Sequence, residues 1–181
     1  MEKCRLVFSG AGGQGVITAA IVLAEAAALH EQLNATQAQS YGPEARGGAT
    51  RSDVIISDSA IRFPKVLQPN LLVCLTQGAY SKYHTIIRPG GVLLLDSRLV
   101  EKNINVDARQ IALPMYQTVM DQIGKPIVFN ICMLGAVLGI CSLVRAESVM
   151  KVLKTRIPAE YLEMNQQALH LGLGLGEQYS L

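Results

Sequence analysis

Residues 9–16 read SGAGGQGV, and this glycine run constrains the fold more than any other part of the chain. It follows the apolar segment 4–9 (CRLVFS) and precedes the segment 16–33 (VITAAIVLAEAAALHEQL), which carries no charge before Glu25. A buried strand, a glycine turn and an apolar helix in this order predict the opening unit of a Rossmann-like fold.

The rest of the chain continues the alternation of strands and helices. Apolar segments predict strands at 70–75, 92–96 and, more weakly, 105–113, with helices at 78–91 and from Pro114 to about Ile123. A hairpin with its turn at Asp58-Ser59 is expected over 50–63, and the chain is expected to be helical after Lys125, at 128–143, 146–156 and 159–170. We therefore expect one domain over 1–181, of α/β class. Its mainly parallel Rossmann-like sheet would be flanked by helices, with an inserted hairpin and a helical C-terminal part.

Composition excludes some classes of protein. Half of the residues are hydrophobic and the net charge is only +2, so a large core is expected and nucleic acid is not an expected partner. Segment 127–144 has no charged residue, but it is short for a membrane span and includes Asn130, so a fully buried helix is favoured. The glycine loop begins too early to follow a signal peptide, and a cytoplasmic location is expected. The glycine-rich tail 171–181 is expected to fray or to pack only in a complex.

The glycine loop offers the backbone geometry of a phosphate site. Gly10, Gly12 and Gly15 fit the G-x-G-x-x-G pattern, in which glycines permit a tight turn, close approach of a phosphate and close helix packing. The alternative is a tight turn that binds nothing. No acidic residue stands between Asn34 and Pro43 to hold a ribose, which argues against a dinucleotide, and the Gly-Lys-Ser/Thr ending of a P-loop is missing.

A second loop, SYGPEARGG at 40–48, combines turn residues with charge. It offers Arg46 to a phosphate or a partner carboxylate and Tyr41 for stacking, and it could face the glycine loop, although plain turn chemistry explains it equally well. No catalytic serine, cysteine or histidine arrangement and no metal-ligand spacing is found, and Cys4, Cys74, Cys132 and Cys141 read as core residues. The sequence thus predicts a binding domain without a catalytic centre or a metal site of its own.

The two loops together resemble the gamma subunits of the 2-oxoacid:ferredoxin oxidoreductases. The resemblance rests on GAGGQGV, SYGPEARGG and the late segment NICMLGAVLG (130–139), and the wording of the second loop is similar to that of the 2-oxoglutarate and branched-chain members. The family usually has an apolar strand before the second loop, whereas EQLNATQAQ is polar here, which suggests an edge or frayed strand.

The resemblance implies a subunit that works only in a complex. Alpha and beta subunits, and a ferredoxin-like delta subunit, would carry thiamine diphosphate and the iron–sulfur clusters, and the complex would convert a 2-oxoacid to an acyl-coenzyme A while reducing ferredoxin. This chain would help to bind coenzyme A, with Asn130 capping or bracing the late helix. The implied site comprises Gly10, Gly12, Gly13, Gln14, Gly15, Tyr41, Gly42, Pro43, Glu44, Arg46, Gly47 and Gly48. The alternatives are a stand-alone dinucleotide-dependent oxidoreductase and an assembly subunit that binds no ligand.

Overall fold

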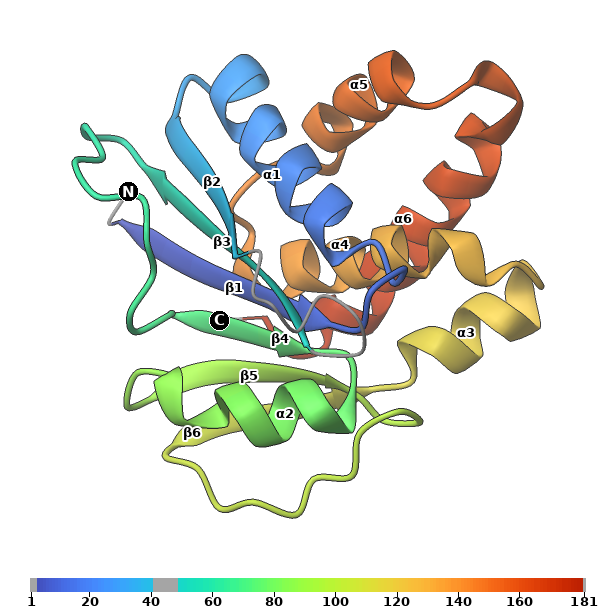
Figure 1. The fold of residues 1–181 in the computed structure, drawn as a ribbon. Helices are drawn as coiled ribbons and strands as arrows, with labels where there is room; N and C mark the ends of the chain where they lie inside the picture. The colour runs from blue at the N-terminus through green and yellow to red at the C-terminus, as the bar shows by residue number, and fades with distance from the viewer. Residues whose placement is uncertain (1–2, 41–48, 181) are drawn as a thin grey trace.

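The computed structural model describes residues 3–40 and 49–180, and within these ranges six strands form one sheet in the order β2-β3-β1-β4-β5-β6 (Figure 1). β1, β4, β5 and β6 run parallel, whereas β3 is antiparallel to both β1 and β2. The strands are β1 (Cys4–Gly10), β2 (Asn34–Ser40), β3 (Thr50–Ser57), β4 (Leu71–Cys74), β5 (Gly91–Asp96) and β6 (Ala108–Leu113). The predicted Rossmann-like α/β class is confirmed.

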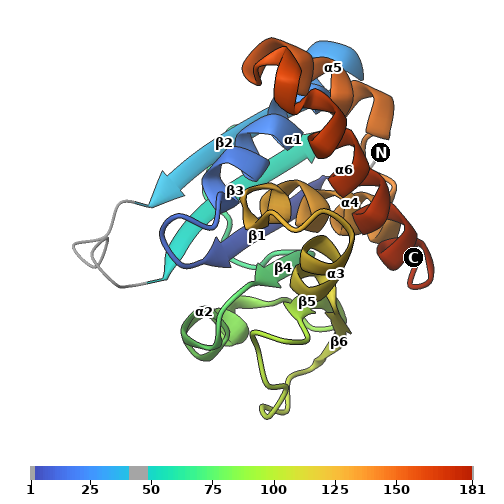
Figure 2. The ribbon, with the colours of Figure 1, turned by 90° about the vertical axis from the view of Figure 1, so that its right-hand side faces the viewer.

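Helices cover both faces of this sheet, but unequally (Figure 2). One face packs against α1 and the helices that follow β6, whereas the described part of the other face carries the short elements α2 and η1 and loops. The helices are α1 (Val16–His30), α2 (Gln77–Tyr83), α3 (Met115–Gln122), α4 (Phe129–Cys141), α5 (Ala146–Arg156) and α6 (Leu162–Glu177), with short 3₁₀ turns η1 (His84–Ile86), η2 (Pro126–Val128) and η3 (Ala159–Tyr161).

The alternation of side chains along β1 builds both cores. Leu6 and Phe8 pack under α1 and α4, while Val7 between them joins the smaller cluster on the α2 side, and all three are fully buried. A central strand covered on both faces has no polar side, which is why its sequence reads as a continuous apolar run.

The hairpin lies elsewhere than predicted. Residues 50–57 form the single strand β3, and its hairpin partner is the polar segment β2, not a second strand after Asp58. β2 is the edge of the sheet, where backbone pairing with β3 provides the order that its polar side chains do not (Asn34 pairs with Ser57).

The C-terminal tail was also predicted wrongly. Its glycines belong to α6, which continues to Glu177 and lies directly on α4. A Cβ added to Gly172 would fall on the carbonyl oxygen of Cys132, and one added to Gly139 would lie 2.6 Å from the Leu173 oxygen. The glycine-rich sequence therefore allows close contact between the two helix backbones.

This contact explains why α4 has no charged side. The sheet covers one side and α6 another, so that Phe129 through Ile140 are all buried, as the sequence predicted for this segment. Among the described residues, no helix has the length and hydropathy needed to cross a membrane.

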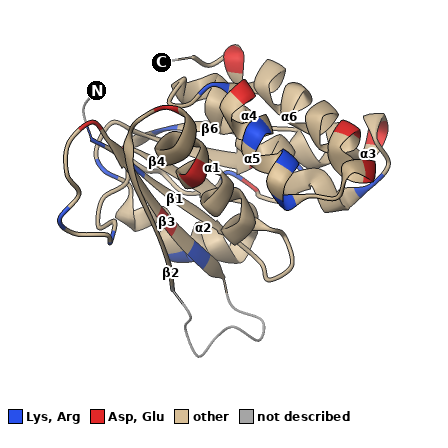
Figure 3. Cartoon of the chain, turned by 90° about the horizontal axis from the view of Figure 1, so that it is seen from above, with Lys and Arg blue, Asp and Glu red and all other residues tan. Residues whose placement is uncertain are grey.

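Charged residues are spread over the helices, the strands and the loops (Figure 3). Two ion pairs join α1 to the region of α5: Glu31 accepts from Nε of Arg145 at 3.0 Å, and Glu25 accepts from Nε of Arg156 at 2.6 Å. Both pairs join segments that lie far apart in the sequence.

Candidate functional site

The glycine loop between β1 and α1 is closed by a side chain of its own. The backbone N–H of Ala11 donates to Oε1 of Gln14 at 2.7 Å, and the N–H of Gln14 donates to the Ala11 oxygen at 3.3 Å. A Cβ on Gly10 would lie 2.5 Å from that same Oε1. Gly10 therefore makes room for the Gln14 side chain, and Gln14 shapes the loop from within.

Gly12 and Gly13 form the open face of the loop. Both are exposed, and a Cβ built on either would meet no atom within 4 Å, although Gly13 has a φ of 86° that disfavours other residues. The first turn of α1 beside them has neither an acidic residue nor a side-chain cap. N–H groups and the positive end of the helix dipole thus face solvent, an arrangement that suits an anion.

Gly15 is required by its backbone conformation and by its contact with Asn130. Its φ is 72°, and a Cβ there would lie 2.5 Å from Nδ2 of Asn130, which donates a long hydrogen bond of 3.4 Å to the Gly15 oxygen. The pattern predicted a glycine for packing of the helix against the sheet, and the structure shows packing against α4 instead. Asn130 does not cap α4, which has no side-chain cap; it joins α4 to the start of α1.

The second predicted loop falls outside the described residues. This holds for Tyr41, Gly42, Pro43, Glu44, Arg46, Gly47 and Gly48. The strands on either side are placed, since Thr50 of β3 pairs with Gly10 and Ser40 of β2 pairs with Arg51. Both ends of the segment therefore lie at the end of the sheet where β1 leads into the glycine loop.

An apolar cavity of about 390 Å³ adjoins the start of α1. Thr18 of the first turn, Lys125 and Asn130 line it. Its other lining residues are Ile127, Val128, Ile131, Ile157, Tyr161, Met164 and Asn165. Ile127 at this surface is 77% exposed.

A buried carboxylate that the sequence analysis did not identify lies at the same end of the sheet as the glycine loop. Asp96 ends β5; its Oδ1 accepts from the N–H of Arg98 at 3.0 Å and its Oδ2 from the N–H of Tyr116 at 2.7 Å. Burial raises the pKa of Asp96 against the opposing effect of these bonds. The aspartate that closes the apolar run VLLLD was the available signal, and its role is to hold the chain entering α3.

The cysteines behave as core residues, as predicted. Cys74 and Cys132 are fully buried, and burial raises the pKa of each thiol to about 12. Cys4 and Cys141 are partly buried, with pKa values raised to about 11 and about 12. In the described part of the chain no three His, Cys, Asp or Glu side chains gather as a metal site.

Comparison with known proteins shows which family the chain belongs to. The sequence profile of the family described as pyruvate ferredoxin/flavodoxin oxidoreductase matches residues 5–175, nearly the whole chain. The chain belongs to this oxidoreductase family. The match includes both glycine-rich loops, α4 and most of α6, so it extends over every element of the site.

Individual relatives agree with the family assignment. The chain is 45% identical to the 2-oxoglutarate synthase subunit KorC of Methanocaldococcus jannaschii, over 94% of this chain and 92% of that protein. A crystal structure of the keto/oxoacid ferredoxin oxidoreductase gamma subunit from Geobacter sulfurreducens PCA superposes with a TM-score of 0.87 at 39% identity, covering 97% and 99% of the two chains.

A larger enzyme contains the same fold. The 2-oxoglutarate:ferredoxin oxidoreductase from Magnetococcus marinus, solved with 2-oxoglutarate, coenzyme A and succinyl-CoA bound, matches 98% of this chain with 32% of its own, at a TM-score of 0.87 and 20% identity. At that identity the likeness establishes the fold alone.

Proposed function

We propose that this chain is the gamma subunit of a 2-oxoacid:ferredoxin oxidoreductase and that its glycine loop binds phosphate groups of coenzyme A. The observation that carries the proposal is the open face of the loop. Gly12 and Gly13 leave the backbone bare beside the uncapped start of α1, where an anion would meet N–H groups and where the first turn of the helix has no acidic residue. We also propose that residues 1–181 form one gamma-type domain.

The site's surroundings fit coenzyme A in kind. Its phosphates need positive potential, which the start of α1 and Lys125 supply, and the apolar cavity next to them suits a less polar part of the ligand. Arg46 and Tyr41 of the second loop are proposed as further contacts, since both ends of that segment emerge beside Gly10.

The proposed substrate is 2-oxoglutarate. Identity is 45% to the 2-oxoglutarate synthase subunit of M. jannaschii but 33% to the pyruvate synthase subunit PorC of Methanothermobacter marburgensis. We propose that alpha, beta and delta partner subunits in the cytoplasm supply thiamine diphosphate, the iron–sulfur clusters and the exit to ferredoxin. The exposed Ile127 and the half-exposed Tyr161 would then contact a partner subunit.

The test is Gly12→Asp in the assembled complex. A carboxylate beside the phosphates removes backbone contacts and adds repulsion, which together should cost about 2–4 kcal/mol, or roughly 30- to 1000-fold in the apparent constant for coenzyme A. Decarboxylation to the thiamine-bound intermediate precedes coenzyme A and should be nearly unaffected. Arg46→Ala should weaken the binding of coenzyme A less strongly and should leave the assembly of the complex intact.

Gly12→Ala is the matched control, because a methyl group there meets no atom and adds no charge. If Gly12→Asp leaves the coenzyme A constant unchanged in a complex shown intact by gel filtration, the loop is only a structural turn. The alternative of a stand-alone dinucleotide enzyme predicts 2-oxoacid oxidation by the purified chain alone, whereas the subunit proposal predicts none even with thiamine diphosphate and coenzyme A added.

A further inference from the structure

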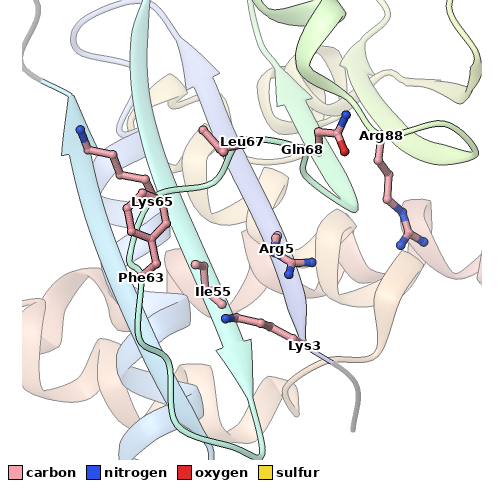
Figure 4. Close-up of a pocket in the computed structure, with 8 residues that line it drawn as sticks. All are labelled: Lys3, Arg5, Ile55, Phe63, Lys65, Leu67, Gln68 and Arg88. Carbon is pink, nitrogen blue, oxygen red and sulfur yellow. The ribbon is translucent and has the colours of Figure 1, made fainter.

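A basic cavity of about 680 Å³ opens at the end of the sheet opposite the glycine loop, and the proposed function does not use it. Figure 4 shows its lining residues: Lys3, Arg5, Ile55, Phe63, Lys65, Leu67, Gln68 and Arg88. β1 begins beside this cavity at Cys4 and ends at the glycine loop at Gly10. At about 3.3 Å per residue, the two places lie roughly 20 Å apart.

The cavity concentrates positive charge that nothing else in the described structure neutralises. Lys3 and Arg5 enter at the start of β1, Lys65 from the loop after β3, and Arg88 from the segment before β5. No carboxylate lines the cavity, and none of these four side chains has a hydrogen bond or an ion pair to another described residue. A cleft lined by charges of one sign attracts counter-ions.

The neighbouring cation shows the contrast. Arg51 lies on the same face of the sheet but is paired with Asp53, with 2.7 Å between Nε and Oδ1. Asp53 also accepts the backbone N–H of Val66 at 2.9 Å, which ties the loop after β3 to the sheet. The fold thus neutralises the arginine that holds this loop and leaves the cations of the cavity available.

The same loop supplies an apolar wall. Val66 is buried, whereas Phe63 and Leu67 on either side of it are 55% and 74% exposed. Ile55 of β3 adds a further apolar contact. Asp53 holds this loop to the sheet at Val66, and the Phe63 ring, which lines the cavity, is exposed enough to contact a ligand.

We propose that this cavity binds a nucleotide, a small molecule that carries two or more phosphates on a planar base. The phosphates contact Lys3, Arg5 and Arg88, because guanidinium groups bind phosphate oxygens in pairs, and the base stacks on Phe63. The volume falls within the range of roughly 300–1,000 Å³ that small-molecule sites occupy. A concave, charged cavity with one aromatic wall favours such a ligand over a flat acidic protein surface.

Calorimetry on the full chain tests this with ADP, pyrophosphate, adenosine and a hexaglutamate peptide as probes. ADP should bind saturably, pyrophosphate more weakly, and adenosine not at all. Arg5→Gln combined with Arg88→Gln should lower the affinity for ADP by about 10- to 100-fold, as expected for lost charge-assisted hydrogen bonds. Phe63→Ala should lower the affinity for ADP but leave the affinity for pyrophosphate unchanged.

Lys151→Gln combined with Lys154→Gln removes the same charge from exposed positions on α5 and should leave ADP binding unchanged. Arg88→Gln alone alters only an exposed side chain, so it keeps the test valid if the Arg5 change unfolds the protein. Absence of saturable ADP binding at millimolar concentration would overturn the proposal. So would equal affinity in the cavity variants, or binding of hexaglutamate without ADP, which would indicate an acidic protein partner.

The outcome is separable from the coenzyme A proposal. Gly12→Asp should leave ADP binding to the chain intact, while the Arg5 and Arg88 changes should leave the apparent coenzyme A constant of the complex intact. Loss of ADP binding in Gly12→Asp would place ADP at the glycine loop and end the proposal for the cavity.

Discussion

Gly15→Ala should destabilise the protein through one identifiable neighbour. An alanine at a φ of 72° costs roughly 1–2 kcal/mol in backbone strain. Its Cβ would also lie 2.5 Å from Nδ2 of Asn130, and overpacking of this kind costs about 1–3 kcal/mol. The free energy of unfolding should therefore fall by about 2–5 kcal/mol, whereas Gly12→Ala, with open space around its Cβ, should change it by less than about 0.5 kcal/mol.

A double-mutant cycle separates the two contributions. Asn130→Gly removes all three atoms that a Cβ on Gly15 would overlap, Nδ2, Cγ and Cβ of Asn130, so adding Gly15→Ala to it should cost only the strain, and the coupling between the two changes should be about 1–3 kcal/mol. The assay is urea unfolding followed by far-ultraviolet circular dichroism, since the chain has no tryptophan. Additivity within about 0.5 kcal/mol would refute the claim that Gly15 is required by contact with α4.

Three further changes test the rest of the fold. Gly172→Ala should cost at least about 2 kcal/mol because its Cβ meets the Cys132 oxygen, whereas Gly174→Ala in the same helix, with nothing within 4 Å, should stabilise by roughly 0.5–1 kcal/mol; urea midpoints compare them. Bonds from Arg145 and Ser148 lower the pKa of Glu31 to about 2 from the ordinary 4.5, so its contribution to stability is complete above pH 4.5 and is lost as the pH falls toward 2. The urea midpoints of the wild type and Glu31→Gln should accordingly converge over that interval, and a constant difference would exclude the role. Asp96→Asn replaces an acceptor of three backbone N–H groups and should lower the thermal midpoint at pH 7; an unchanged midpoint would show that the carboxylate is not needed for the start of α3.

The elements that the sequence predicted correctly share a physical basis. β1, β4 and β5 are covered on both faces, so their apolar runs indicate strands without reference to the rest of the fold. α4 is enclosed on all sides, and its uninterrupted hydrophobicity predicts that enclosure. In both cases the information that decides the structure is local.

The errors arose where a distant partner decides the structure. The hairpin was placed wrongly because the partner of β3 is the polar segment β2, which only the family resemblance had suggested as an edge strand and which no local apolar pattern reveals. The glycines of α6 read as a frayed tail because their purpose, contact with Gly135 and Gly139, lies more than thirty positions away.

The glycine loop shows the same division. The pattern correctly placed a turn between a strand and a helix, and Gly12 and Gly13 are open as a phosphate site requires. It could not show that Gly10 makes room for the Gln14 side chain, because the pattern leaves the residue type at position 14 open, or that Gly15 makes room for Asn130, which comes from α4.

The contact between α4 and α6 has a consequence for how the protein is made. α4 leaves the ribosome before α6 has been synthesised, and until residues 162–177 follow, the backbone surface at Gly135 and Gly139 has no cover. The nascent chain therefore passes through an interval in which the side of α4 that α6 will cover, which carries no charge, is exposed to water and to its neighbours. Chaperone engagement and aggregation during synthesis should both be concentrated in that interval, and release of the last twenty residues should end it.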